Sequence, residues 1–316
     1  MRAAAAAGAD VRGATVYVSL EPCNHHGRTG PCTQALIEAG IARVVIGAPD
    51  PNPKTAAGGI ARLRAAGLTV EVRDDPVARA LVERFAFTIV APLPFVTLKM
   101  AMSLDGAIAP RPGANYGISG APARERVREL RYEYDAVMVG AGTIRIDDAQ
   151  LTVRPYRTRR KPYVRVVVCE TDAVPVGSRV FVTPADAPKK GYGPTIVLAP
   201  AGARPRFAAL EQIAEVVYVG DEQMRTLDLA AALRTLRERE ITTVLCEGGP
   251  TLAGRLLEGR LVQRVIWFVA PRFLQTPSAV GVLAGADLTR FADGWRFDRV
   301  ERVGEDMLVS ARVDHV

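Results

Sequence analysis

Short runs of aliphatic and β-branched residues alternate with longer amphipathic segments through the first third of the chain. Runs of this kind predict buried strands, and apolar residues that recur every three or four positions predict helices. The predicted strands are 14–20, 43–47 and 69–72, and the predicted helices are 33–39, 58–66 and 76–87. Parallel strands need a crossover connection, which a single helix supplies. The pattern therefore favours an α/β fold built on a parallel sheet.

The same alternation resumes after a proline-rich segment, Ala91–Pro94. We interpret this segment as the boundary between a domain of residues 1–90 and a second domain of residues 95–316. A chain of 316 residues is long enough for two separate cores. Beyond the boundary, strands are predicted at 165–169, 195–198, 215–219, 264–270 and 307–313, helices at 121–133 and 229–240, and strands that run on into turns at 95–106, 135–143 and 243–254.

The basic charge limits the class of ligand. The formal net charge is +7, and arginine dominates the basic residues. There is no lysine-rich run and no basic stripe interleaved with aromatic residues, so nucleic acid is not the expected partner. Guanidinium binds phosphate in a bidentate way, so the arginine content is consistent with a phosphorylated small molecule as ligand. A coding bias toward alanine and arginine is the other explanation for this content. The basic run 157–161 is expected to be solvated surface.

The cysteine count and the hydropathy indicate the compartment. Four cysteines are too few and too unevenly spaced for a secreted disulfide framework. No segment has the length of a membrane span, and the alanine run at 3–7 is not followed by the apolar core of a leader peptide. We therefore expect a soluble, cytoplasmic protein without a membrane partner.

Two cysteines lie close together in the loop after the first predicted strand. Cys23 and Cys32 each follow a proline and can direct two thiolates at one zinc ion from a loop that enters a helix. Zinc usually takes four ligands, so this pair is an incomplete set. His25 and His26 belong to the same loop and would have to fold back onto the metal. A pair of buried structural thiols is the alternative interpretation.

Two strands of the second domain end in glycine-rich turns. Gly140–Thr143 follows one strand, and Glu247–Gly249 follows another, with Pro250 near the first turn of the next helix. Glycine lets a backbone approach a phosphate closely, and the free amides of a helix N-terminus attract an anion. A Gly-x-Gly sequence alone is weak support, but a purely structural turn would not need a glutamate at 247. We expect an anionic ligand at these turns.

Residues 22–32, Pro-Cys-Asn-His-His-Gly-Arg-Thr-Gly-Pro-Cys, closely resemble the second zinc motif of the bacterial bifunctional riboflavin biosynthesis deaminase/reductase family. The segment Asp50–Pro53 also resembles that family. Four later segments do so as well, at 95–106, 135–143, 147–154 and 243–254. The resemblance implies a truncated cytidine-deaminase-like layered domain, followed by a dihydrofolate-reductase-like domain.

The resemblance also implies roles for individual residues. Lys99 and Glu247 are the candidates for catalysis. The cofactor-binding candidates are Ala101, Gly117, Thr143, Asp147, Gly249, Pro250, Thr251, Leu252, Ala253 and Gly254. The substrate-binding candidates are Asn115, Arg131, Leu151, Arg154, Glu247 and His25, and the zinc candidates are Cys23 and Cys32. Of these, Arg131 and Arg154 are expected to clamp the ribose phosphate.

The sequence departs from the family pattern at three places. The His-x-Glu motif, which supplies a zinc ligand and the acid/base carboxylate in zinc deaminases, is absent, so the zinc site is expected to be incomplete and deamination negligible. A start codon assigned too far downstream is the favoured explanation, and a deaminase remnant is the other. Ala149 stands where the family has proline. The family's tryptophan is missing near Gly117, and Tyr116 could supply the ring.

The resemblance implies two consecutive reactions on a phosphoribosyl diaminopyrimidine. Zinc-dependent deamination comes first, and NADPH-dependent reduction of 5-amino-6-(5-phosphoribosylamino)uracil to the ribitylamino product follows. One alternative is a reductase with a non-catalytic deaminase-like module, and another is a zinc-stabilised nucleic-acid-binding protein, whose binding would fall steeply with salt. The resemblance also implies a homo-oligomer formed through the reductase half. The preference for NADPH over NADH is not fixed by spacing.

Overall fold

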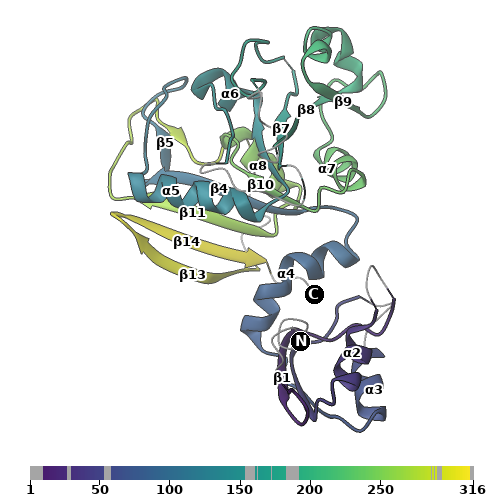
Figure 1. The fold of residues 1–316 in the computed structure, drawn as a ribbon. Helices are drawn as coiled ribbons and strands as arrows, with labels where there is room; N and C mark the ends of the chain where they lie inside the picture. Colours follow the sequence, from purple (N-terminus) through teal and green to yellow (C-terminus); the bar gives the residue numbers. More distant parts are fainter. Residues whose placement is uncertain are drawn as a thin grey trace. The chain divides into compact units, whose positions relative to one another are not determined.

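The computed structural model divides the chain into two compact units, Met1–Pro92 and Leu93–Val316 (Figure 1). It describes residues 10–26, 30–52, 58–153, 161, 163–171, 173–182, 192–285, 287, 289 and 294–313. Within these ranges, no helix has both the length and the apolar character needed to cross a membrane.

The first unit is a small parallel sheet with helices, as its alternating pattern predicts. Its strands, β1 (Thr15–Leu20), β2 (Arg43–Ala48) and β3 (Thr69–Val72), pair in parallel in the order β1-β2-β3. Its helices are α2 (Cys32–Glu38), α3 (Gly58–Ala65) and α4 (Pro76–Val90). The core gathers around Leu36, Val44, Ile46 and Leu63. Within the described residues β1 lies at the edge of this sheet, with alternate side chains exposed.

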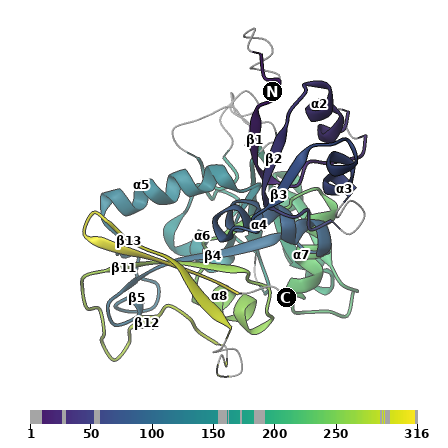
Figure 2. The same cartoon turned by 90° about the horizontal axis from the view of Figure 1, so that it is seen from below.

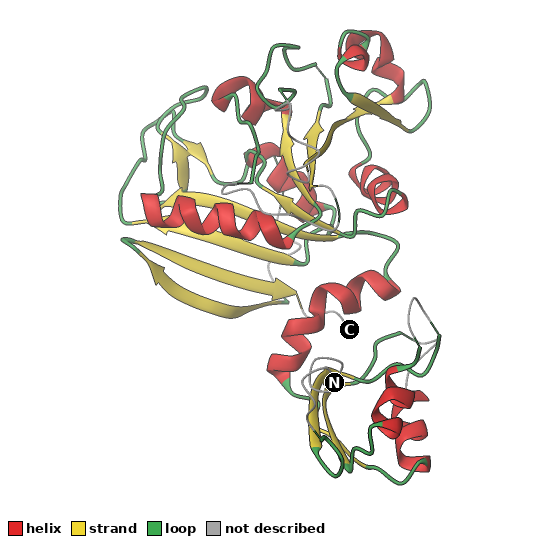
Figure 3. Cartoon of the chain, viewed as in Figure 1, coloured by secondary structure: helices red, strands yellow, loops and turns green. Residues whose placement is uncertain are grey.

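The second unit is built on a nine-stranded sheet of order β13-β14-β11-β4-β10-β6-β7-β8-β9 (Figure 3). Seven neighbouring strands run parallel, from β11 to β9, and the hairpin β13–β14 adds an antiparallel edge. The strands are β4 (Phe95–Ser103), β6 (Ala136–Gly140), β7 (Tyr163–Val168), β8 (Tyr192–Pro200), β9 (Glu215–Val219), β10 (Thr243–Cys246), β11 (Arg264–Ala270), β13 (Trp295–Val303) and β14 (Asp306–Val313). A separate two-stranded sheet pairs β5 (Ala107–Ala109) with β12 (Val280–Gly281).

Helices cover both faces of the large sheet (Figure 2). On one face α7 (Leu229–Glu238) and α8 (Pro250–Glu258) pack their leucines against β-strand residues such as Val244 and Cys246. On the other face lie α5 (Ala121–Leu130), which packs against Leu245, and α6 (Ala141–Asp147), which buries Ile144. Short 3-10 segments at Arg131–Glu133, Ala201–Phe207 and Leu210–Gln212 complete the unit. The continuous apolar runs of the central strands follow from burial on both faces.

The sequence pattern did not predict three strands of the structure. β5 and β12 are too short to show a period. β13 is long, but most of its side chains are exposed on both faces of the sheet edge, and charged residues occupy many of them. An edge strand with charged residues avoids pairing with other chains, and the same charges remove the apolar alternation by which a strand is recognised.

The order of the strands creates a switch point between β10 and β6. After β6 the chain passes through α6 on one face and continues to β7, while after β10 it passes through α8 on the other face and continues to β11. Neighbouring parallel strands whose connections leave in opposite directions open a crevice beyond their carboxyl ends, where ligands bind in open α/β sheets. The fold therefore places a crevice next to Gly140 and Glu247.

Candidate active site

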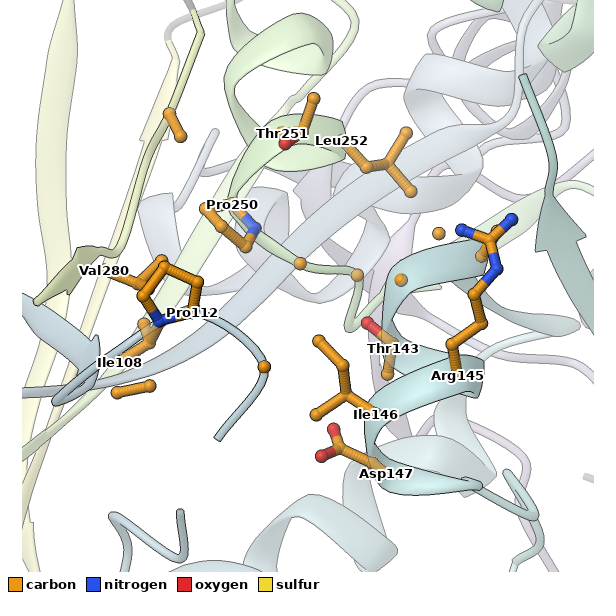
Figure 4. A pocket seen from close by; sticks show the side chains of 18 of the residues that line it. Ile108, Pro112, Thr143, Arg145, Ile146, Asp147, Pro250, Thr251, Leu252 and Val280 are labelled. Atoms are coloured by element: carbon orange, nitrogen blue, oxygen red, sulfur yellow. The ribbon is translucent and has the colours of Figure 1, made fainter. Parts of the chain in front are cut away.

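A cavity of about 600 Å³ lies at this switch point. Figure 4 shows Thr143, Arg145, Ile146 and Asp147 on one wall, from α6, and Pro250–Leu252 at the start of α8. The opposite wall comes from the β4–β5 region and the segment around Val280 (Figure 4). A cavity of this size suits a small ligand or part of a cofactor.

The two glycine-rich turns approach each other closely. A Cβ added to Gly248 would lie 2.7 Å from Cδ2 of Leu252 and 3.2 Å from the backbone nitrogen of Gly140. Only glycine fits between the turns at this point. Beside it, Gly142 is open, with no atom within 4 Å of an added Cβ. Neither α6 nor α8 has a side-chain cap at its N-terminus, so their first amides can meet an anion in the cavity.

Glu247, which follows β10, forms a bidentate ion pair with Arg131. Nε and Nη2 of Arg131 donate to the two carboxylate oxygens at 2.6 and 2.9 Å. Nη1 of Arg131 also donates to the carbonyl oxygen of Thr152, at 2.8 Å. The side chains are only 10% and 16% exposed, for Glu247 and Arg131 respectively. Burial by itself would raise the pKa of Glu247, but the charge and hydrogen bonds of Arg131, together with the charge of Lys99, hold that pKa below its usual value.

Lys99 lies on β4 beside this pair and lines the cavity. Its ammonium nitrogen is 5.6 Å from the ring centre of Phe268. Burial lowers the pKa of Lys99, and the nearby Arg131 lowers it further, while the charge of Glu247 acts in the opposite direction. The result is an amine that releases a proton more readily than an exposed lysine.

A strained turn at Leu151 precedes the Thr152 carbonyl, which accepts a hydrogen bond from Arg131. Leu151 has φ +53°, in the left-handed region that few non-glycine residues occupy. Its side chain is buried and packs with Val153 and Ile144. The packing of Leu151 therefore fixes the position of the Thr152 carbonyl opposite Arg131. The structure places Leu151 in the core rather than in the wall of the cavity, so a direct substrate contact remains a prediction.

The structure brings most of the candidate residues of the second unit together. Those that line the cavity are Lys99, Ala101, Thr143, Asp147, Glu247, Gly249, Pro250, Thr251 and Leu252. Arg131 joins them through Glu247. Candidates absent from the cavity lining are Asn115, Gly117, Ala253 and Gly254, of which Ala253 is buried in the core behind α8. Tyr116 lines the cavity, and its role in place of the family's tryptophan remains a prediction. Arg154 lies outside the described residues.

Several cavity residues were not singled out in the sequence. They include Arg111 and Ile108 on the β5 side, and Glu170 and Thr171 directly after β7. The signal that could have found the last group is positional, because the carboxyl end of β7 lies next to that of β6 at the same edge of the sheet. Arg111 gives no such signal, since a loop arginine is common on any surface.

In the first unit the two candidate zinc thiols are close together. The backbone amide of Cys32 lies 3.4 Å from Sγ of Cys23, and the pKa of Cys32 is raised, first by a hydrogen bond with Cys23 and then by burial. No cluster of three or more His, Cys, Asp or Glu side chains able to hold a metal occurs in the part of the chain that the structure describes. Two thiols alone do not match the usual donor set for zinc. His25 belongs to this unit and adds no ligand.

Glu21 has a structural role in the same unit. Its carboxylate is 4% exposed and accepts hydrogen bonds from the backbone amides of Gly59 and Ile60, both at 3.0 Å. It also accepts from the amide of Asp50, at 3.3 Å. The carboxylate therefore satisfies the N-terminus of α3, which explains a buried acid at the end of β1 without catalysis.

The parallel sheet, the two glycine turns at its switch point and the buried Lys99–Glu247–Arg131 cluster define a dihydrofolate-reductase-like enzyme domain preceded by a partial deaminase-like unit. Residues 94–309 match the family described as RibD C-terminal domain, and residues 1–48 match the cytidine and deoxycytidylate deaminase zinc-binding region. The chain belongs to the RibD family of bifunctional riboflavin biosynthesis enzymes, with a reductase domain and part of a deaminase domain.

Individual relatives agree with this assignment. The chain is 36% identical over 305 residues to the riboflavin biosynthesis protein RibD of Aquifex aeolicus, covering 96% of this chain and 82% of that protein. It is 33% identical over 319 residues to RibD of Escherichia coli, covering 95% and 82%. Among solved structures, the deaminase/reductase of Thermotoga maritima superposes with a TM-score of 0.80 at 32% identity, covering 99% of this chain and 83% of that one.

Proposed function

We propose that the second unit reduces 5-amino-6-(5-phosphoribosylamino)uracil to its ribitylamino product with NADPH. The Thermotoga maritima relative is described as a diaminohydroxyphosphoribosylaminopyrimidine deaminase and 5-amino-6-(5-phosphoribosylamino)uracil reductase. The observation that supports the proposal most directly is the shared cavity, in which an anion-binding pair of glycine turns lies next to a buried acid, arginine and lysine cluster. A reductase that acts on two phosphorylated ligands needs these two parts side by side.

The glycine turns are the proposed site of the cofactor phosphates. The N-terminal amides of α8, from Thr251 and Leu252, and the open backbone at Gly142 leave room for phosphate oxygens. Gly248 lets the two turns close on the same group. Thr143 and Asp147 on α6 line the neighbouring wall (Figure 4). NADPH supplies a hydride when it is bound, and the chain supplies the position and the charges.

Lys99, Glu247 and Arg131 are the proposed groups for the substrate end. In the reaction, C1′ of the ribose gains a hydride, the C1′–O4′ bond breaks, and O4′ gains a proton. Lys99 Nζ is the proposed proton donor, because burial lowers its pKa below the usual value for lysine and so makes it a better acid. Glu247 balances the charge of Lys99 and is held in one orientation by Arg131. No histidine among the described residues lines this cavity.

The proposal is tested by mixing the purified chain with NADPH and enzymatically prepared substrate. We expect loss of nicotinamide absorbance and a product heavier by two hydrogens in mass spectrometry. Lys99→Met should lower kcat by about a hundredfold while NADPH still quenches protein fluorescence on binding. If the wild-type chain binds NADPH but never yields the heavier product, the proposed reaction is wrong.

The first unit is proposed to contribute no deamination in this chain. The described residues offer two neighbouring thiols and no third metal ligand, so no zinc-dependent step is assigned to it. These residues support a reductase that carries a deaminase-like module without deaminase activity. We also propose a homo-oligomer and a cytoplasmic location, as the family resemblance implies.

A further inference from the structure

The carboxyl ends of four neighbouring strands lie in a row along the cavity. Lys99 is on β4, Glu247 follows β10, Gly140 ends β6, and Glu170 and Thr171 follow β7. Adjacent strands are about 4.8 Å apart, so the row from β4 to β7 spans roughly 14 Å. If the reacting end of the cofactor lies at Lys99 and its diphosphate at the glycine turns, as proposed above, its adenosine ribose falls at the end of β7.

Arg145 reaches this end of the row from α6. Figure 4 shows its side chain projecting to the side of the cavity opposite Ile108 and Pro112. Its Nη2 donates to the carbonyl oxygen of Ala173 at 3.4 Å, in the loop after β7. Its charge also acts to lower the pKa of Cys169 at the end of the same strand, although burial raises that pKa to about 12 overall. The guanidinium of Arg145 therefore lies over the strand end where the ribose is expected.

A strand end in this position can favour either NADH or NADPH. An acidic residue there binds the ribose 2′-hydroxyl of NADH, and an arginine binds the 2′-phosphate of NADPH. Both residue types are present, as Glu170 and Arg145. Glu170 is engaged in an ion pair with Arg255 of α8, and both side chains are 29% exposed. Arg206 adds a further positive charge, because it donates to the Thr171 carbonyl oxygen at 2.7 Å.

We infer that Arg145 binds the 2′-phosphate and makes the site selective for NADPH over NADH. The charge of Glu170 is offset by Arg255, so Glu170 does not cancel the charge of Arg145, which favours a phosphate dianion over a neutral hydroxyl. This inference rests on the proposed function, since it uses the cofactor position assigned there. Arg145 is exposed, so its contact with the phosphate weakens as salt is added.

The test compares kcat/KM for NADPH and for NADH in the full chain and in two matched variants. Arg145→Gln should lower the value for NADPH about tenfold and leave the value for NADH nearly unchanged. Arg234→Gln removes the same charge from the exposed face of α7, outside the cavity, and should change neither value. Arg145→Lys should recover part of the preference, because it restores the charge without the bidentate geometry.

Binding of a fragment gives a second readout that needs no turnover. Adenosine 2′,5′-bisphosphate should bind the wild type about tenfold more tightly than ADP by calorimetry, and Arg145→Gln should abolish that difference. Glu170→Gln should leave NADH activity unchanged or raise NADPH preference. An unchanged NADPH to NADH ratio in Arg145→Gln, or a selective loss of NADH activity in Glu170→Gln, would overturn the inference while leaving the reductase intact. Absence of any dinucleotide oxidation would instead overturn the proposed function.

Discussion

At the scale of single residues, the Glu247–Arg131 pair connects stability to activity. Both side chains are mostly buried, and Arg131 donates hydrogen bonds to both oxygens of the Glu247 carboxylate and to the Thr152 carbonyl. Removing one member of a buried pair leaves the other as an uncompensated charge. The same carboxylate faces Lys99, so any change at Glu247 reaches the reacting end of the cavity.

Replacing Glu247 should affect folding and catalysis together. We expect Glu247→Gln to lower the free energy of unfolding by about 3 kcal/mol, because Arg131 is left buried without its counter-ion. The reductase kcat should fall about a hundredfold as Lys99 loses the charge that orients it. Urea denaturation and initial rates check the two effects. Glu301→Gln, which removes a partly exposed partner of Arg299, is the control and should change the free energy of unfolding by less than about 1 kcal/mol.

The stability contributed by Glu247 should depend on pH in the acid range. The folded pKa of Glu247 lies below its usual value of 4.5, so the folded state favours the ionised form. That contribution is fully present above pH 4.5 and is lost as the pH falls through the folded pKa. The difference in Tm between the wild type and Glu247→Gln should therefore be constant near neutral pH and shrink progressively in acid. A difference that grows on acidification contradicts the assigned direction.

At the scale of elements, the contact between the turns before α6 and α8 shapes the anion site. α6 begins directly after β6, α8 begins after Glu247–Gly249, and neither has a side-chain cap. A Cβ at Gly248 would contact Leu252 and the backbone of Gly140. The glycine pattern in the sequence predicted each turn separately. It did not show that the two turns touch, since β10 and β6 are more than a hundred residues apart in the chain and meet only through sheet pairing.

Two glycine-to-alanine changes should separate packing from binding. Gly248→Ala places a methyl group against Leu252 and the Gly140 backbone, so we expect a loss of about 1–3 kcal/mol and weaker NADPH binding. Gly142→Ala meets no atom within 4 Å and lies in a helix, so Tm should stay level or rise while the added methyl group narrows the cavity and weakens NADPH binding. Thermal melts with and without NADPH distinguish these outcomes. Equal effects of the two changes on the Tm without NADPH would show that the turns are not in close contact.

At the scale of the whole molecule, the two units differ in how complete their sites are. The second unit has a cavity with polar groups that converge on it, and the first unit has two thiols without a third ligand among the described residues. Within the described residues, β1 is the edge strand of the small sheet, and alternate side chains along it are exposed. The boundary proposed from the proline-rich segment and the homo-oligomer remain predictions.

The reductase reaction should be independent of metal. Dialysis against a strong chelator should leave the rate of NADPH oxidation unchanged, since no group assigned to that reaction is a metal ligand. Added zinc should not produce ammonia from the diaminopyrimidine substrate, because two thiols provide neither a complete site nor an acid/base carboxylate. Metal analysis by mass spectrometry and an ammonia assay check both statements. Zinc-dependent ammonia release would contradict the second.

The sequence by itself determined the elements and the kinds of group in the site. Periodicity placed most central strands and helices, since residues buried on both faces must be apolar. The family resemblance proposed Lys99 and Glu247 as candidates, and the glycine pattern proposed an anionic ligand at the two turns. It did not reveal β13, whose side chains are solvated. It also did not reveal Glu170 or Arg145 as neighbours in one cavity. Those facts depend on strand order, and strand order is set by pairing between distant segments, which no local pattern encodes.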